Sequence, residues 1–214
     1  ALVRTYHLAI KLLVGTALPL AVMATFLAIP MVGLLGGREF LPDGALALQL
    51  MVWSIPFGWI NSVTNYLLVA LGQQRALTRA FAIAVTFNIV INAIFIPIYG
   101  FRAAAVSTIL SEIVVGACFQ WYIYRHLQRT PWMHLFWRLA AAAGIMVVVT
   151  WIGMQLHLIL GLLLGGLVYI ASSVALGVLD AEERKLLATI VPEALRRPFT
   201  ALTVRLHNII ASVS

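Results

Sequence analysis

The chain alternates between long apolar runs and short polar connections. An apolar run of roughly 20 residues is long enough to cross a bilayer as one α-helix. Six runs meet this requirement, and each predicts one transmembrane helix: Leu12 to Leu35, Ala45 to Leu71, Leu77 to Ile98, Ala103 to Tyr124, Leu139 to Leu156, and Ile159 to Leu179. The pattern therefore predicts an all-α integral membrane protein with six transmembrane helices.

Two places in these runs predict local geometry. We expect the second helix to bend at Pro56 and Gly58, because proline removes a backbone donor and glycine loosens the helix. The third and fourth runs are joined by a short connection, Pro97 to Arg102, which predicts a tight corner between neighbouring helices. The two runs should therefore lie antiparallel.

The last residues have a different pattern. Asp180 and Glu183 have capping-box spacing ahead of apolar positions, and Arg196, Arg197 and Arg205 lie beside the apolar Phe199, Leu202, Leu206 and Ile209. This favours an amphipathic segment on an anionic cytoplasmic leaflet, with a loosely ordered tail as the alternative. We predict three regions: four spans in 1–127, two additional spans in 128–179 and a cytoplasmic amphipathic tail in 180–214.

Composition and charge agree with a membrane protein. The chain is 63% hydrophobic and 10% charged, which leaves too little polar surface for a soluble globule of this size. Its 14 basic residues outnumber 7 acidic ones, but they lie singly or in pairs in short loops. A nucleic-acid partner is therefore not expected, because such proteins gather their bases into a patch or stripe.

The distribution of basic residues predicts the orientation. Two bases, Arg38 and Arg102, lie in connections on one side, and the other twelve of the 14 lie on the opposite side. Because Lys and Arg accumulate on the cytoplasmic face, both ends of this chain are expected inside.

Paired amides occur within two of the runs. Asn61 and Asn65 lie on the second run, and Asn88 and Asn92 on the third. Each pair is four residues apart, so both amides project from one helix face. Two interpretations stay open: hydrogen bonds that hold neighbouring helices together, and contacts with a polar substrate.

One carboxylate, Glu112, lies inside the fourth run. An acidic group at the centre of a lone helix costs roughly 2.5 to 3.5 kcal/mol on insertion scales, so we expect Glu112 to face protein or water. It is a candidate for a proton or cation site or for a hydrogen bond to a polar substrate, and the alternative is a structural acid paired with Ser or Asn. We predict no catalytic residue, metal site or cofactor, because the five histidines are scattered and no phosphate-binding loop occurs.

Several short segments resemble one family. They are Leu71-Gly72-Gln73-Gln74-Arg75, Asn88-Ile89-Val90-Ile91-Asn92, Ile96-Pro97-Ile98-Tyr99-Gly100, Ala103-Ala104-Ala105 and Ser111-Glu112. In order and spacing, roughly Leu8 to Leu127 is similar to the C-terminal part of polysaccharide biosynthesis flippases, which belong to the multidrug/oligosaccharidyl-lipid/polysaccharide exporter superfamily. The resemblance implies two six-helix lobes around a cavity that opens alternately to the two membrane faces. This chain would be a piece of a longer protein, the C-terminal lobe without its N-terminal partner lobe.

The resemblance also implies a function and its partners. The substrate would be a polyprenyl-diphosphate-linked glycan, a precursor of lipopolysaccharide or exopolysaccharide, flipped across a bacterial inner (cytoplasmic) membrane. The expected partners are membrane lipids, the missing N-terminal lobe, a glycan polymerase and glycosyltransferases. Asn61, Asn65, Asn88, Asn92 and Glu112 are the candidates for the substrate path. A cation-coupled multidrug antiporter of the same superfamily is the main alternative, and a membrane-embedded glycosyltransferase is an alternative from another class.

Overall fold

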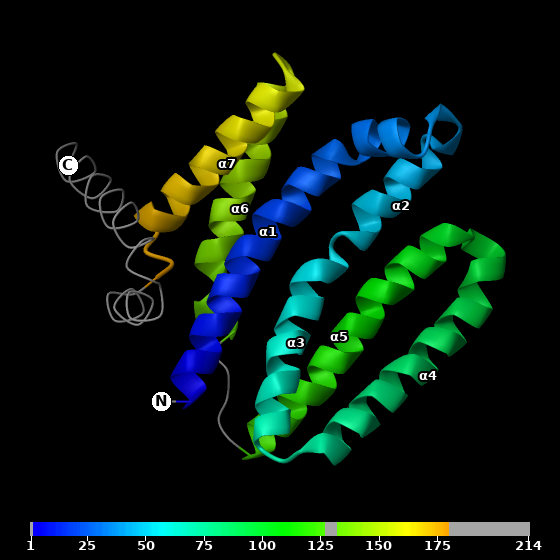
Figure 1. The fold of residues 1–214 in the computed structure, drawn as a ribbon, viewed down its shortest axis with the longest axis vertical. Coiled ribbons are helices and arrows are strands. Elements are labelled where there is room, and N and C mark those ends of the chain that lie inside the picture. The colour runs from blue at the N-terminus through cyan, green and yellow to red at the C-terminus, as the bar shows by residue number, and fades with distance from the viewer. Residues whose placement is uncertain (1, 127–131, 180–214) are drawn as a thin grey trace. The chain divides into compact units, whose positions relative to one another are not determined.

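The computed structural model describes residues 2–126 and 132–179. This part of the chain folds into seven α-helices and one short 3-10 helix, η1, and contains no strand (Figure 1). The elements are α1 (Leu2–Leu35), η1 (Arg38–Phe40), α2 (Asp43–Met51), α3 (Ser54–Ala70), α4 (Gln74–Tyr99), α5 (Phe101–His126), α6 (Trp132–Met154) and α7 (Leu158–Ala175).

Six helical segments in the described residues are long and apolar enough to cross a membrane, with α2 and α3 together forming one of them, Asp43–Ala70. The prediction of an all-α protein with six transmembrane helices is therefore confirmed, and the chain is a multi-pass membrane protein. The first helix was expected to begin at Leu12, but α1 begins at Leu2 and continues past Lys11. The amphipathic tail predicted in 180–214 lies outside the described residues.

The second span is interrupted, and the position differs from the expected one. α2 ends at Met51 and α3 begins at Ser54, so the break falls at Val52 and Trp53, ahead of Pro56. Pro56 lies in the first turn of α3. A backbone N–H at this position would have no acceptor within the helix, so proline removes no helical hydrogen bond here. The proline therefore supports the start of a new helix inside the span.

The corner between α4 and α5 is tighter than the expected connection. α4 continues through Pro97 to Tyr99, and α5 begins at Phe101, so Gly100 alone makes the turn. Gly100 has a φ of 58°, a left-handed conformation that glycine adopts without steric cost. Asn88 lies as far before Gly100 as Glu112 lies after it, so the antiparallel hairpin places both at a similar level.

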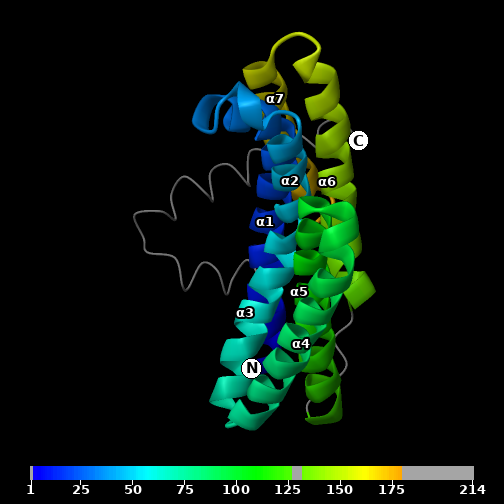
Figure 2. The same cartoon turned by 90° about the vertical axis from the view of Figure 1, so that its right-hand side faces the viewer.

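The chain divides into two compact units, one containing α1 to α5 and the other α6 and α7. In the first unit, α3 packs against α1 on one side and α5 on the other, and α4 packs along α5. Both views show α4 and α5 side by side along their length (Figures 1 and 2). α3, α4 and α5 lie around a common space, which several polar residues of these helices line.

Small residues bring the helices of the second unit close together. Gly153 on α6 faces Gly161 on α7, where a Cβ on Gly153 would lie 2.6 Å from the Gly161 Cα. About one turn away, before Gly153 on α6 and after Gly161 on α7, Gly165 lies against Thr150, which is fully buried. The Arg138 guanidinium on α6 donates to the Gly177 carbonyl just after α7. Glycine at these positions permits a close approach of the two backbones.

Candidate functional site: a polar pocket between α3, α4 and α5

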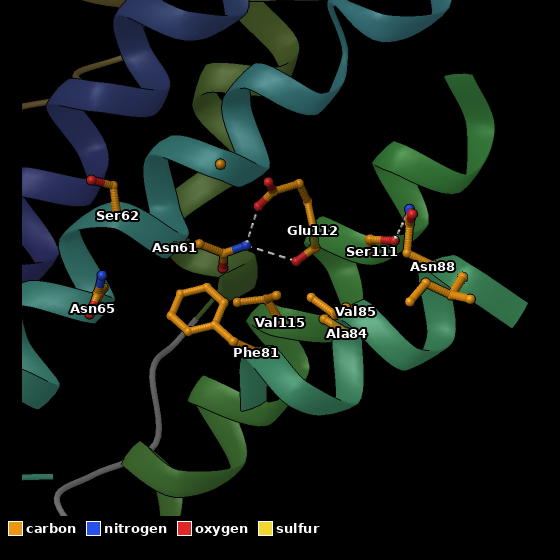
Figure 3. Close-up of a pocket in the computed structure, with 12 residues that line it drawn as sticks. Asn61, Ser62, Asn65, Phe81, Ala84, Val85, Asn88, Ser111, Glu112 and Val115 are labelled. Atoms are coloured by element: carbon orange, nitrogen blue, oxygen red, sulfur yellow. Dashed lines mark hydrogen bonds between the residues drawn. The ribbon is translucent and has the colours of Figure 1, made fainter. Parts of the chain in front are cut away.

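A pocket of about 430 Å³ lies among α3, α4 and α5 (Figure 3). Its walls combine amides, hydroxyls and one carboxylate with apolar side chains. The lining residues are Gly58, Asn61, Ser62, Asn65, Phe81, Ala84, Val85, Asn88, Ile89, Ser111, Glu112 and Val115. All three helices belong to segments able to cross a membrane, so the polar groups lie within the spanning region.

Asn61 of α3 is hydrogen-bonded to Glu112 of α5 at the centre of the site. Its Nδ2 atom donates to Glu112 Oε2 at 2.8 Å and to the Glu112 main-chain carbonyl, also at 2.8 Å (Figure 3). Asn61 is buried. A hydrogen bond to a charged acceptor is stronger than one between neutral groups, and it offsets part of the cost of placing a carboxylate in the membrane. The other carboxylate oxygen, Oε1, accepts no hydrogen bond from the described residues.

Two glycines lie against this pair. A Cβ atom on Gly58 would lie 3.7 Å from the Glu112 carboxylate carbon, so α3 presents bare backbone to the acid. On α5, a Cβ atom on Gly116 would lie 3.0 Å from Asn61 Oδ1. Gly116 is one helical turn after Glu112, and its N–H is the regular helical donor to the same carbonyl that Asn61 binds. Gly116 thus lets the Asn61 amide lie close against α5, whereas a Cβ at Gly58 would make only an ordinary van der Waals contact with Glu112.

A second set of hydrogen bonds connects α4 with α5. Asn88 Nδ2 donates to Ser111 Oγ at 2.8 Å, and Asn92 Nδ2 donates to Asn88 Oδ1 at 2.9 Å. Ser107 Oγ lies 2.6 Å from Asn92 Oδ1, and Ser111 Oγ donates to the Ser107 carbonyl at 2.7 Å. These four side chains form a connected set of hydrogen bonds across the hairpin. Their geometry fits the interpretation of amides that hold helices together.

Four of the five candidate substrate-path residues line one pocket: Asn61, Asn65, Asn88 and Glu112. Asn92 does not line it and reaches it indirectly, through its hydrogen bond to Asn88. Asn65, by contrast, lines the pocket and makes no hydrogen bond to another described residue, and the same holds for Ser62. The amides of Asn61 and Asn88 are thus partly used within the protein, whereas the Asn65 amide is available to a ligand.

Phe81, Gly58, Gly116 and Ser62 were not among the residues singled out from the sequence as part of this site. Phe81 precedes Asn88 by two helical turns and therefore lies on the same face of α4. Gly116 follows Glu112 by one turn on α5. These spacings are the features of the sequence that point to Phe81 and Gly116 as part of the site. An aromatic residue or a glycine within an apolar helix, however, usually indicates helix packing.

A separate buried cluster connects the helices of the first unit near the start of α1. Tyr6 of α1 lies 2.8 Å from Thr64 Oγ1 of α3, and Gln120 Nε2 of α5 donates to the Tyr6 hydroxyl at 3.0 Å. The Thr64 hydroxyl donates to the Ile60 carbonyl at 2.8 Å. Because the Thr64 proton is used in that bond, Tyr6 is the donor to Thr64. This cluster joins α1, α3 and α5 beside the pocket, since Thr64 lies about one turn from Asn61.

The fold and the site together define a multi-pass membrane protein with a polar pocket among its spanning helices. Residues 1–94 match the family described as MatE, which is a family of membrane transporters and not of enzymes. The match covers α1 to α3 and most of α4, and therefore two of the three helices that form the pocket.

The chain is also similar to an uncharacterized membrane protein, MJ1068, of Methanocaldococcus jannaschii, with 25% identity over 127 residues. The alignment covers 59% of this chain and 25% of that protein, so the chain spans about a quarter of the length of this relative. No solved structure matches significantly.

Proposed function

We propose that the full-length protein flips a lipid-linked oligosaccharide, a glycan on a polyprenyl diphosphate, across the cytoplasmic membrane by alternating access. The obstacle is the head group, because sugar hydroxyls and phosphates cannot enter hydrocarbon without hydrogen-bonding partners. Asn61, Asn65, Asn88, Asn92 and Glu112 belong to the path that supplies such partners, while the lipid tail stays in the bilayer. The observation that carries this proposal is the polar pocket of about 430 Å³ inside the spanning region.

The proposal extends to location and partners. Both ends of this chain lie on the cytoplasmic side of a bacterial inner membrane, in agreement with the basic residues of the connections. The rest of the protein, including an N-terminal lobe, forms the opposite wall of the cavity. Glycosyltransferases supply the lipid-linked glycan, and a polymerase consumes it after translocation.

Alanine variants of the five residues in the full-length protein test this function. A strain that lacks the gene is complemented with each variant at matched membrane abundance, and surface glycan is measured. We expect Asn65→Ala and Glu112→Ala to reduce surface glycan most, because their polar atoms are available to a ligand. Normal surface glycan in all five variants would refute the proposed path, and normal surface glycan in the deletion strain would refute the function.

One feature favours a second function, a cation-coupled multidrug antiporter. Glu112 keeps one carboxylate oxygen free in the pocket while Asn61 holds the other, an arrangement in which a proton or cation can bind the free oxygen. In that case efflux of a cationic drug would depend on a sodium or proton gradient and be abolished by Glu112→Gln, and deletion of the gene would leave surface glycan normal. The two functions therefore give opposite results in the same set of strains.

A further inference from the structure

The charge of the pocket bears on which part of a lipid-linked glycan, the diphosphate or the sugars, it can bind. Among its lining residues, Glu112 is the one charged side chain, and no Lys or Arg is present. A diphosphate placed here would meet a carboxylate and no compensating cation, and like charges at close range are strongly unfavourable. The pocket is therefore unsuited to the diphosphate.

The available polar atoms suit hydroxyl groups. Glu112 Oε1 is an acceptor, the Asn65 amide supplies a donor and an acceptor, and the Ser62 hydroxyl can act as either. None of these three groups forms a hydrogen bond with another described residue. A sugar ring carries several hydroxyls that each donate and accept, so each of these groups can find a partner on a sugar.

Phe81 adds an apolar platform to these polar groups. Its ring packs edge-to-face against Phe119, with ring centroids 5.7 Å apart and planes at 87°, and Phe119 is fully buried. This contact helps to hold the Phe81 ring in place, while 43% of the residue stays exposed. In the close-up, the ring points toward Asn61 (Figure 3). The negative face of an aromatic ring attracts the C–H groups on the apolar side of a sugar.

The size of the pocket limits what it can hold. About 430 Å³ is in the lower part of the range of roughly 300 to 1,000 Å³ that small-molecule pockets occupy. This volume is large enough for a short piece of a glycan.

We propose that this pocket is a subsite for one uncharged sugar ring of the transported glycan, with Phe81 as its stacking platform and Asn65 and Glu112 as its hydroxyl-binding groups. The diphosphate binds elsewhere in the full-length protein. The inference rests on the proposed function, since it assigns a part of that substrate to this pocket.

The test compares two phenylalanines of α4 in the full-length protein. Phe95 is 39% exposed and lies on nearly the same helix face as Phe81, but it is outside the pocket and stacks on Tyr99. Surface glycan export is measured at graded supply of the lipid-linked precursor and at equal membrane abundance. We expect Phe81→Leu to raise the half-saturating supply about three- to tenfold. Phe81→Tyr and Phe95→Leu should stay within about twofold of the wild type.

Further variants exclude a purely structural effect. Phe119→Leu removes the ring that contacts Phe81 and keeps the platform, so its half-saturating supply should change less than that of Phe81→Leu, whatever its melting temperature. Glu112→Gln keeps hydrogen-bonding atoms and loses only charge, so it should export better than Glu112→Ala.

Two results would overturn the sugar subsite while leaving glycan flipping intact. One is export that depends on the gene but responds equally to Phe81→Leu and Phe95→Leu. The other is a Glu112→Gln variant that exports as little glycan as Glu112→Ala, which would show that the charge itself is required. Export that does not depend on the gene at all would instead refute the proposed function, so the two failures are distinguishable.

Discussion

Gly116 lies directly against the Asn61 amide: a Cβ atom at position 116 would be 3.0 Å from Asn61 Oδ1. Gly116→Ala should therefore displace the amide and weaken its two hydrogen bonds to Glu112, at a cost of about 1 to 2 kcal/mol for intramembrane hydrogen bonds. The same change favours the helix by roughly 1 kcal/mol, because alanine has the higher helix propensity. The free energy of unfolding in mixed micelles containing SDS measures the sum.

A matched variant separates these two contributions. Gly144 of α6 is a helical glycine with open space around it, so Gly144→Ala should show the propensity gain alone. Gly116→Ala should be less stable than Gly144→Ala by about 1 to 2 kcal/mol. In an Asn61→Ala background the difference should vanish, since no amide remains to be displaced. A difference that persists there would contradict the proposed contact.

A charge at position 61 gives a second prediction. In the structure, Asn61 Nδ2 donates to Glu112 Oε2 at 2.8 Å. Asn61→Asp replaces this donor with a second acidic group. Two carboxyl groups at this distance cannot both be ionised without strong repulsion, and a carboxyl group supplies no N–H to the Glu112 carbonyl. We expect Asn61→Asp to lower stability more than Asn61→Ala, by roughly 1 to 3 kcal/mol. Adding Glu112→Gln to Asn61→Asp should recover most of this loss, because the Gln amide can donate to the Asp carboxylate. Thermal unfolding of the wild type, Asn61→Ala, Asn61→Asp and the double variant checks both statements.

The six membrane spans could be predicted because the length of an apolar run is local information. The break between α2 and α3 was misplaced for a physical reason. A proline such as Pro56 interrupts a helix in its interior but is favourable in a first turn, and only the position of the preceding break at Val52 and Trp53 decides between the two.

The site was predictable in part. Asn88 and Glu112 were recognisable because polar groups within apolar runs are costly, and the turn at Gly100 explains why they lie at one level. The partner of Asn61 on α5 depends on how α3 packs, which no spacing along the chain reveals. Phe81 and Gly116 carry no polar signal at all, so their roles required the tertiary structure.

The Tyr6 hydroxyl gives a third prediction. It donates to Thr64 and accepts from Gln120, so Tyr6→Phe removes two buried hydrogen bonds between helices and leaves the ring in place. We expect a loss of roughly 1 to 2 kcal/mol in unfolding free energy. Tyr66→Phe is the control, because Tyr66 is 73% exposed and makes no hydrogen bond within the described chain. Equal stability of the two variants would mean that the Tyr6 cluster does not hold α1, α3 and α5 together.

Gly165 gives a fourth prediction, in the second unit. A Cβ atom at this position would overlap the hydroxyl of Thr150, whose side chain is fully buried on α6. Gly165→Ala should force α6 and α7 apart and cost roughly 1 to 3 kcal/mol, the usual range for overpacking. Thr150→Ala removes the hydroxyl that the new methyl group would meet, although the Thr150 Cβ remains 3.1 Å from it. The double variant should therefore recover part of the loss, and a double-mutant cycle of unfolding free energies measures the coupling. Strictly additive costs would show that Gly165 and Thr150 are not in contact.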